Sequence, residues 1–334
     1  SQMLAVLDLR QDLSFITKGL SVSAMLNISR LSEYGVQRYY NPFYYALSGY
    51  DYYTGKYTLE PLNEESGTEY LKYSETGKDV TNTLYSEVRL NYARDFGKHG
   101  VSGLLVFTTH ETLYANAGSL QLSLPSRNVG LAGRFTYNYN SRYFVEFNFG
   151  YNGSERFAKN HRWGFFPSVG CAWIISNEEF FKPAKEVISN LKFRYSYGLV
   201  GNDNIGSSSD RFYYLSNVNF NGPGAKFGQY AQTSYSGVTV SRYANENIGW
   251  EKSYKSNYAI ELGLFNKLNI TAEYYNETRT NILMTRADIP VTMGLTASMK
   301  SNVGKAAVKG VDIQCEYQQR WGKDFWASAR LNFT

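Results

Sequence analysis

Apolar and polar residues alternate with a period of two along several segments of this chain. The pattern is sharpest over residues 130–151, GLAGRFTYNYNSRYFVEFNFGY, on either side of Asn140-Ser141. One face would carry Leu131, Phe135, Tyr137, Tyr139, Tyr143, Val145, Phe147, Phe149 and Tyr151, and the other Arg134, Thr136, Asn138, Glu146 and Asn148. Successive side chains of a β-strand point to opposite faces, so the pattern predicts two strands joined by a tight turn at Asn140-Ser141.

The same alternation recurs over residues 191–200, 268–274, 311–318 and 327–333. In each segment one face is apolar and rich in Tyr and Phe, whereas the other is charged or carries amides. A water-soluble sandwich would bury a mostly aliphatic face. A transmembrane barrel turns its apolar face to lipid and its polar face to a watery lumen, with aromatic residues at the two interfaces. The sequence therefore predicts an all-β fold, a transmembrane antiparallel β-barrel that contacts the lipid bilayer.

Turn residues divide the chain into about twelve strands, paired as six hairpins. The predicted strands cover residues 3–10, 19–30, 83–96, 100–113, 128–140, 142–153, 163–176, 189–200, 248–265, 268–285, 302–319 and 324–334. Connections within hairpins are short, whereas those between hairpins include two long polar loops, 31–82 and 201–247. Outer-membrane barrels have short periplasmic turns and long extracellular loops, so the long loops are expected outside the cell.

The composition argues against several other classes of protein. The 334 residues are 43% hydrophobic and 16% aromatic, but contain no run of about 18 apolar residues, which excludes a helical membrane protein. The net charge of +5 is scattered along the chain, so nucleic-acid binding is not expected. Cys171 and Cys315 fall on the outward face of separate strands, which argues against a disulfide.

The sequence contains no motif that predicts a catalytic, metal or phosphate-binding site. The three histidines, His99, His110 and His161, stand alone, so neither a metal site nor a cofactor is predicted. Residues 201–206, GNDNIG, lack the lysine and the strand-helix context of a phosphate loop and indicate a loop entry. Carboxylates on the polar face, such as Glu261 and Glu273, are expected to set the polarity of the lumen. Ser176 and Glu179 have the spacing of a capping box, which predicts a short capped helix.

Aromatic residues of the loops are the candidates for ligand contact. Flat rings with hydroxyl tips can stack on sugars or line a peptide groove, but packing of a long loop against its neighbours is the more common role of a single loop tyrosine. The candidate substrate or lid contacts are Tyr39, Tyr40, Tyr44, Tyr45, Trp163, Tyr213 and Tyr214.

Several segments resemble the SusC/RagA-like family of TonB-dependent outer-membrane transporters. They are LSFITKGLSVSAMLNIS at 13–29, the stretch 131–181 with RYFVEFNFGYNGSERF and RWGFFPS, LKFRYSYGLVGNDNIG at 191–206, NENIGWEKSY at 245–254 and NVGKAAVKGVDIQCEYQQRWG at 302–322. The resemblance covers essentially the whole chain in the family's order, and loops 31–82 and 201–247 match least.

The resemblance implies a bacterial outer-membrane barrel of about 22 strands with an internal plug. It also implies a TonB complex that supplies energy, a SusD-like surface lipoprotein that acts as a lid, and import of glycan oligosaccharides or peptides. Residues 1–334 are then expected to be a partial barrel, truncated at both ends and without plug or TonB box. Twelve strands could close alone, but the resemblance favours an open arc. A catalytic role is not predicted; the alternatives are an outer-membrane barrel enzyme and a non-transporting adhesin or structural barrel.

Overall fold

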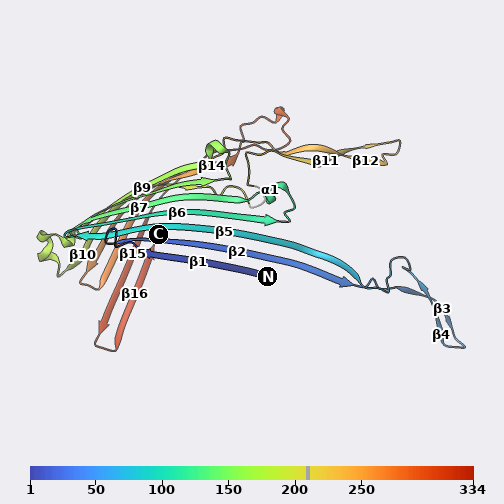
Figure 1. Ribbon diagram of the computed structural model, residues 1–334, viewed down its shortest axis with the longest axis horizontal. Helices are drawn as coiled ribbons and strands as arrows, with labels where there is room; N and C mark the ends of the chain where they lie inside the picture. Colours follow the sequence, from blue (N-terminus) through green and yellow to red (C-terminus); the bar gives the residue numbers. More distant parts are fainter. Residues whose placement is uncertain (208–210) are drawn as a thin grey trace.

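A single curved sheet dominates the computed structural model, which describes residues 1–207 and 211–334 (Figure 1). Within these residues, twelve antiparallel strands follow one another in the order β1-β2-β5-β6-β7-β8-β9-β10-β13-β14-β15-β16. Their bounds are β1 (Gln2–Asp12), β2 (Leu20–Tyr39), β5 (Lys72–Phe96), β6 (His99–Ala115), β7 (Ser126–Tyr139), β8 (Tyr143–Ser154), β9 (Trp163–Ile174), β10 (Ile188–Asn202), β13 (Glu251–Leu264), β14 (Leu268–Thr285), β15 (Lys300–Trp321) and β16 (Phe325–Phe333). The six predicted hairpins are confirmed.

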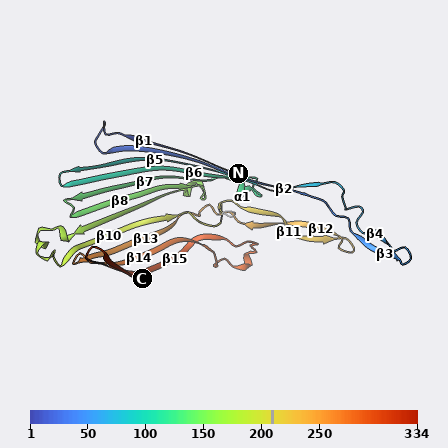
Figure 2. The same ribbon diagram turned by 90° about the horizontal axis from the view of Figure 1, so that it is seen from below.

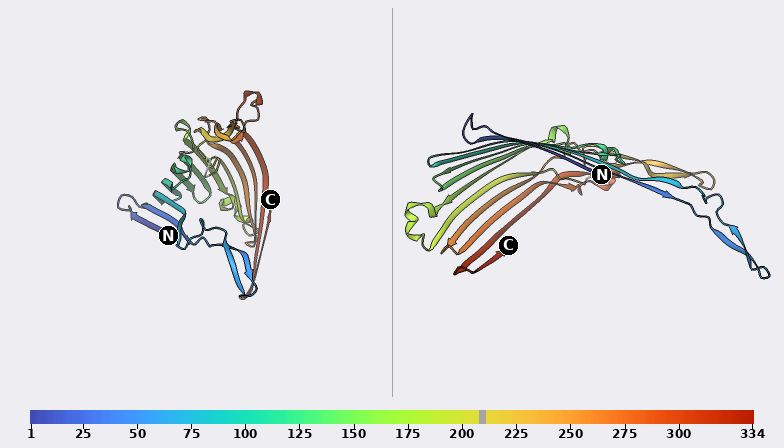
Figure 3. Two further views of the ribbon diagram at one scale, coloured as in Figure 1. Left: turned by 90° about the vertical axis from the view of Figure 1, so that its right-hand side faces the viewer. Right: turned by 60° about the horizontal axis from the view of Figure 1, so that its bottom comes forward.

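The sheet is an open arc and not a closed barrel. Among the residues that the structure describes, β1 pairs only with β2 and β16 only with β15, and the view along the strands shows these two hairpins at opposite edges of the arc (Figure 3). Because the wall is one layer thick, most of its side chains stay at least partly exposed; every residue of β1 is exposed. The expectation of an open arc, in place of a closed twelve-stranded barrel, is confirmed.

Strand pairing confirms that the two faces differ in chemistry. Directly paired residues share a face. Phe147 of β8 lies opposite Phe135 of β7 and Val169 of β9, and this register places aromatic and aliphatic residues side by side. On the other face Arg134 donates to Glu146, with 2.6 Å between Nη2 of Arg134 and a carboxylate oxygen. The first face is therefore apolar and lipid-facing, and the second is the polar lumen face.

The tight turns form where the sequence predicts them. Asn140 and Ser141 both have φ near +52°, the left-handed conformation that the two central residues of a type I′ turn require, and the Arg142 N–H donates to the Tyr139 carbonyl across this turn at 2.9 Å. Asn tolerates this conformation because its short polar side chain can bond locally. The connection between β13 and β14 is built in the same way, with Phe265 and Asn266 at φ +54°.

The structure differs from the predicted boundaries of the two long loops. β2 continues to Tyr39 and β5 begins at Lys72, so residues 31–39 and 72–82 belong to the sheet. Loop 201–247 contains a hairpin of β11 (Asn217–Phe227) and β12 (Thr233–Arg242). Outside the membrane both faces of a strand can be polar, so these extensions show no alternation in the sequence, although their backbone groups pair.

Two hairpins project from the end of the sheet that carries the long loops. One is β11–β12 and the other is formed by β3 (Tyr45–Asp51) and β4 (Lys56–Pro61) (Figures 1 and 2). The opposite end carries the short turns. We refer to residues 40–71, which include β3 and β4, as the arm.

The longest connection at the short-turn end holds two 3-10 helices, η2 (Ile175–Asn177) and η3 (Glu179–Ala184). The predicted capping box is wrong: Ser176 is buried within η2, and its hydroxyl lies 3.4 Å from the Asn190 side chain instead of capping η3. Glu178 ties the segment to the wall through Arg142, at 3.1 Å, and through the indole N–H of Trp173, at 3.1 Å. A hydrogen bond from the Tyr143 hydroxyl holds the pKa of Glu178 below its ordinary value.

Among the described residues, no helix is long and apolar enough to cross a membrane. Cys171 and Cys315 are both free, as the sequence predicts.

Candidate functional site at the extracellular end

The lumen face of the wall carries a ladder of ion pairs across β10, β13 and β14. Glu261 of β13 accepts from Lys192, at 3.3 Å, and lies 2.9 Å from the Nε of Arg194. Arg194 also pairs with Glu273. These are the carboxylates that the alternation places on the polar face, and each has a cationic partner. The arrangement gives the lumen its polarity and leaves no carboxylate of this ladder unpaired for acid-base chemistry.

A small aromatic core lies at the long-loop end of the arc, where the connections β8–β9 and β10–β13 meet. Its buried members are Phe157, Phe166, Ile205, Tyr213, Ile248 and Trp250, with Leu199 and Leu283 packed against them. Phe157 is fully buried, and its ring centroid lies 5.3 Å from that of Trp250. This junction is the best-packed region of the described chain, and it fixes the bases of the extracellular loops.

Gly164 and Gly201 permit this packing, and a Cβ on Gly201 would lie 2.0 Å from the ring of Phe166. A Cβ on Gly164 would lie 2.4 Å from the ring of Phe166 and 3.2 Å from the indole nitrogen of Trp250. The indole N–H donates to the carbonyl of Arg162 at 3.0 Å, so the polar edge of Trp250 is satisfied while its ring is buried.

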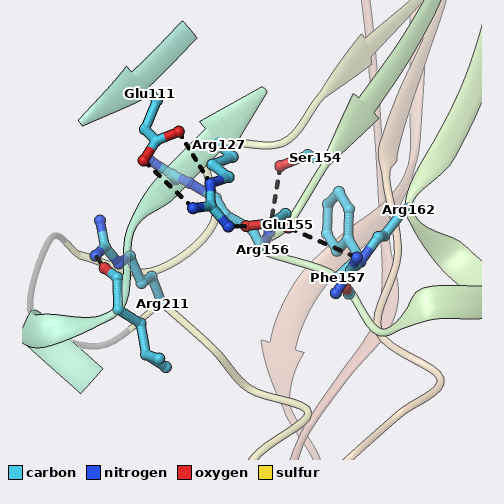
Figure 4. Close-up of polar contacts among 9 residues, drawn as sticks. Glu111, Arg127, Ser154, Glu155, Arg156, Phe157, Arg162 and Arg211 are labelled. Carbon is cyan, nitrogen blue, oxygen red and sulfur yellow. Dashed lines mark hydrogen bonds and ion pairs between the residues drawn. The ribbon is translucent and has the colours of Figure 1, made fainter. Parts of the chain in front are cut away.

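Arg156 joins the β8–β9 connection to the segment 201–206. Its guanidinium donates to the carbonyls of Asp203 and Ile205, at 3.2 and 3.3 Å, and to the side chain of Asn204 at 2.9 Å. The backbone N–H of Arg156 lies 3.4 Å from the Ser154 hydroxyl, which accepts (Figure 4). Since three acceptors of one loop converge on one cation, residues 203–205 form a structural clasp and not a phosphate-binding loop.

Further arginines surround this clasp, and Figure 4 shows how they are arranged. Arg127 makes two hydrogen bonds to Glu111, at 3.1 and 3.3 Å, and lies 3.8 Å from Glu155. Arg162 lies 3.7 Å from the same Glu155. Because Arg127 and Arg162 share Glu155, the cluster of arginines carries a net positive charge.

Arg211 lies at the edge of this cluster and is 3% exposed. It donates to the carbonyl of Leu124 at 2.6 Å, and its guanidinium lies 5.0 Å from the ring centre of Phe212. Burial lowers the pKa of Arg211 from its ordinary value, and the charge of Arg156 lowers it further. An arginine nonetheless stays protonated in a protein, so the junction buries a positive charge.

The structure distributes the predicted contact residues over three places. Tyr39 ends β2, and Tyr40, Tyr44 and Tyr45 lie in the arm; they are 38–59% exposed. Trp163 begins β9 and stacks on Tyr151 of the apolar face, with 4.9 Å between the ring centroids.

Tyr213 and Tyr214 lie at the junction. Tyr213 is 4% exposed, and its ring belongs to the aromatic core. Its hydroxyl accepts a hydrogen bond from the ammonium group of Lys300 at 3.1 Å. Tyr214 is half-buried. Sequence reasoning missed Arg156, Arg242 and Lys300, because nothing in the spacing of these residues predicts that they converge.

Comparisons with known proteins agree with this architecture. Residues 7–334 match the model of the TonB dependent receptor-like, beta-barrel family. The chain is 29% identical over 282 residues to "TonB-dependent receptor P3" of Formosa agariphila, covering 77% of this chain and 27% of that protein. It is 32% identical over 225 residues to "TonB-dependent receptor SusC" of Bacteroides thetaiotaomicron, covering 67% and 21%. The chain thus spans about a quarter of the length of these relatives.

A solved structure shows the same fold. The chain superposes on the structure titled "Structure of the RagAB peptide transporter" with a TM-score of 0.67 and 19% identity, over 99% of this chain and 36% of that one. The open arc, its lipid-facing and lumen faces and the family match lead to one conclusion. The chain belongs to the TonB-dependent receptor-like β-barrel family of the bacterial outer membrane, and it forms a segment of such a barrel wall.

Proposed function

We propose that the complete protein imports nutrients, either glycan oligosaccharides or peptides, across the outer membrane, with energy supplied by a TonB complex. The named relatives are TonB-dependent receptors, and one structural neighbour is a peptide transporter. The lumen face supports this role because its ion pairs are mutually satisfied, which suits a wall that transmits a solute and does not react with it.

A SusD-like surface lipoprotein is the partner that we propose for the extracellular end. The observation that carries this proposal is the arm, which extends the β2–β5 hairpin beyond the wall (Figures 1 and 2). Its tyrosines are exposed: Tyr44 by 59%, Tyr45 by 55% and Tyr53 fully. Exposed tyrosines supply large contact areas at a small cost in side-chain entropy. The exposed Tyr39, Tyr40, Tyr44 and Tyr45 are our first candidates for contact with substrate or lid. The other candidates are Trp163, which stacks on the apolar face, Tyr213, whose ring is buried, and the half-buried Tyr214.

Excision of the arm's hairpin tests this proposal. Leu62 donates to the carbonyl of Tyr44 at 2.8 Å, so the two ends of residues 45–61 lie close together and a short glycine linker can rejoin them. In the full-length protein the excision should lower uptake, or capture of the lipoprotein, because the contact surface is lost. Barrel assembly, read from heat-modifiable migration in a detergent gel, should be unchanged because the arm lies outside the wall.

Point variants separate ring contacts from loop packing. Replacing Tyr40, Tyr44 and Tyr45 together by Ser removes the rings, whereas replacing them by Phe keeps the stacking surface. The Ser variant should lose uptake or lid capture and the Phe variant should keep most of it. If both functions survive the excision, the arm has no part in import and the proposal fails.

A further inference from the structure

Three lysines lie on the outward, lipid-facing side of the wall at its long-loop end. We refer to them as the lysine patch: Lys252 of β13, and Lys305 and Lys309 of β15. Asp312 of β15 lies opposite Glu273 of the lumen ladder, so the residues of β15 at odd numbers face outward. The same alternation places Lys252 on the side of β13 away from the ladder carboxylate Glu261. The patch is therefore separate from the ladder.

The patch begins at the height where the apolar band ends. From Tyr317, an outward aromatic residue near the short-turn end of β15, the strand rises about 20 Å along the membrane normal to Lys309, at about 3.4 Å per residue and a tilt of 35–45°. An apolar band is about 25 Å tall, so Lys309 lies close to its extracellular boundary. The neighbouring strand changes at the same height: the outward residues of β14 pass from Tyr274, opposite Val311, to Asn276, opposite Lys309. The patch is therefore level with the headgroups of the outer leaflet.

The positive charge of the lysine patch is not balanced by the protein. Among the residues that the structure describes, no carboxylate lies within ion-pair distance of any of the three lysines. Glu277 of β14 faces the lumen and pairs with Arg279 on that side. The outward face of β6 and β7 differs, because its Arg127 pairs with Glu111 at 3.1 Å. The outward surface of β13–β15 therefore attracts anions, whereas that of β6 and β7 is compensated.

An apolar groove of about 650 Å³ lies on the same outward face, between the patch and the short-turn end. Its volume falls in the range of about 300 to 1,000 Å³ that is typical of small-molecule sites. On β13, β14 and β15 it is lined by Tyr258, Ile260, Ala272, Tyr274 and Val311. The small side chain of Ala272 lies between two isoleucines of the flanking strands, which leaves the surface hollow there. Val311 is the outward residue of β15 next to Lys309, so the groove and the patch are continuous.

We propose that the groove and the lysine patch together bind one phosphorylated glycolipid of the outer leaflet, with its phosphates against Lys305 and Lys309 and an acyl chain in the groove. A lipid matches both features, because lysines at a membrane surface attract anionic headgroups and each buried methylene group adds to the affinity. A free phosphate ion would leave the groove unused, and a protein partner would have to enter the bilayer to fill it. The inference concerns the wall and does not depend on which solute the protein imports.

Native mass spectrometry of the purified full-length protein, released from detergent, counts bound lipids and tests the proposal. The probes are bisphosphorylated lipid A, the same lipid without its phosphates, and inorganic phosphate as a competitor. Bisphosphorylated lipid A should bind at one saturable site, and more tightly than the lipid without phosphates. Lys305→Gln with Lys309→Gln should weaken this binding about 30-fold, and the corresponding pair of Arg replacements should retain it. The matched control is Lys159→Gln with Lys226→Gln, which removes two exposed lysines outside the patch and should change nothing.

A second variant tests the groove. Ala272→Phe fills the hollow and should weaken binding of lipid A about tenfold, because roughly two methylene groups of the chain lose their place. Barrel assembly, read from heat-modifiable migration, should be unchanged because the new ring joins a face that already contacts lipid. Inorganic phosphate at millimolar concentration should not displace the lipid, since it cannot use the groove.

Four results would overturn the proposal. The first is equal binding of lipid A with and without its phosphates, and the second is a double Gln variant of Lys305 and Lys309 that binds like the control. Complete displacement of lipid A by inorganic phosphate would make the patch a site for free anions. Unchanged binding by Ala272→Phe would show that no acyl chain occupies the groove, and the assignment of one lipid to both features would fall.

Discussion

An arginine at Phe147 is the sharpest test of the assignment of faces. Phe147 lies in β8 midway between Tyr143 and Tyr151, which mark the two aromatic interfaces. At about 3.4 Å per residue the strand places each tyrosine about 13 Å away, or about 10 Å along the membrane normal after the usual tilt of 35–45°. In an apolar band about 25 Å tall, Phe147 is therefore close to the midplane.

Phe147→Arg should destabilise the full-length barrel by about 2 to 4 kcal/mol, because an arginine at this depth must be hydrated or must deform the bilayer. This corresponds to a change of roughly 30- to 700-fold in the folding equilibrium. Tyr151→Arg, at the interface, should cost at most about 1 kcal/mol from the charge. The assay is equilibrium unfolding by guanidinium in phospholipid vesicles, followed by tryptophan fluorescence.

The matched control is Ser196→Arg on the lumen face of β10. Ser196 lies opposite Gly170 of β9, whose missing side chain leaves room, and Gly170 lies opposite Glu146 of β8, which offers an opposite charge. The cost should be within about 0.5 kcal/mol. Equal destabilisation by Phe147→Arg and Ser196→Arg, or none by either, would refute the assignment of the two faces.

Three further predictions concern the ends and the edges of the wall. Glu178→Gln should destabilise the barrel at neutral pH. Because the pKa of Glu178 is lower in the folded than in the unfolded protein, the carboxylate stabilises the fold fully above the unfolded pKa of about 4.3, and this stabilisation is lost as the pH falls through the folded pKa. The denaturation midpoints of the variant and the wild type should therefore converge in acid. Phe157→Ala should cost about 3 to 5 kcal/mol, because a fully buried ring leaves a cavity against Trp250; hydrogen exchange should rise at the junction, and unchanged protection would contradict this. Residues 1–334 alone should form heterogeneous aggregates in detergent, because β1 and β16 leave unpaired backbone groups; a monodisperse, heat-resistant species would contradict this.

The sequence by itself determined the twelve strands, their pairing as hairpins and the two faces of the wall. These properties are local: a strand directs Phe147 and Asn148 to opposite faces whatever lies around it, and Asn140-Ser141 can adopt the left-handed turn without help from distant residues. The membrane adds a second constraint, because lipid tolerates polar side chains on only one face, so the alternation persists through the spanning segments.

The fold of the long-loop end of the wall is determined only by the tertiary structure. Beyond the bilayer both faces of a strand meet water, so the extensions of β2 and β5 and the β11–β12 hairpin have no periodic signature. Tyr213 reads as a loop tyrosine in the sequence, but it is buried because Trp250 and Ile248 come from another part of the same connection to cover it. Lys300 and Tyr213, whose hydroxyl accepts from the lysine, are 87 residues apart in the sequence. No rule of sequence spacing predicts a contact between residues so far apart.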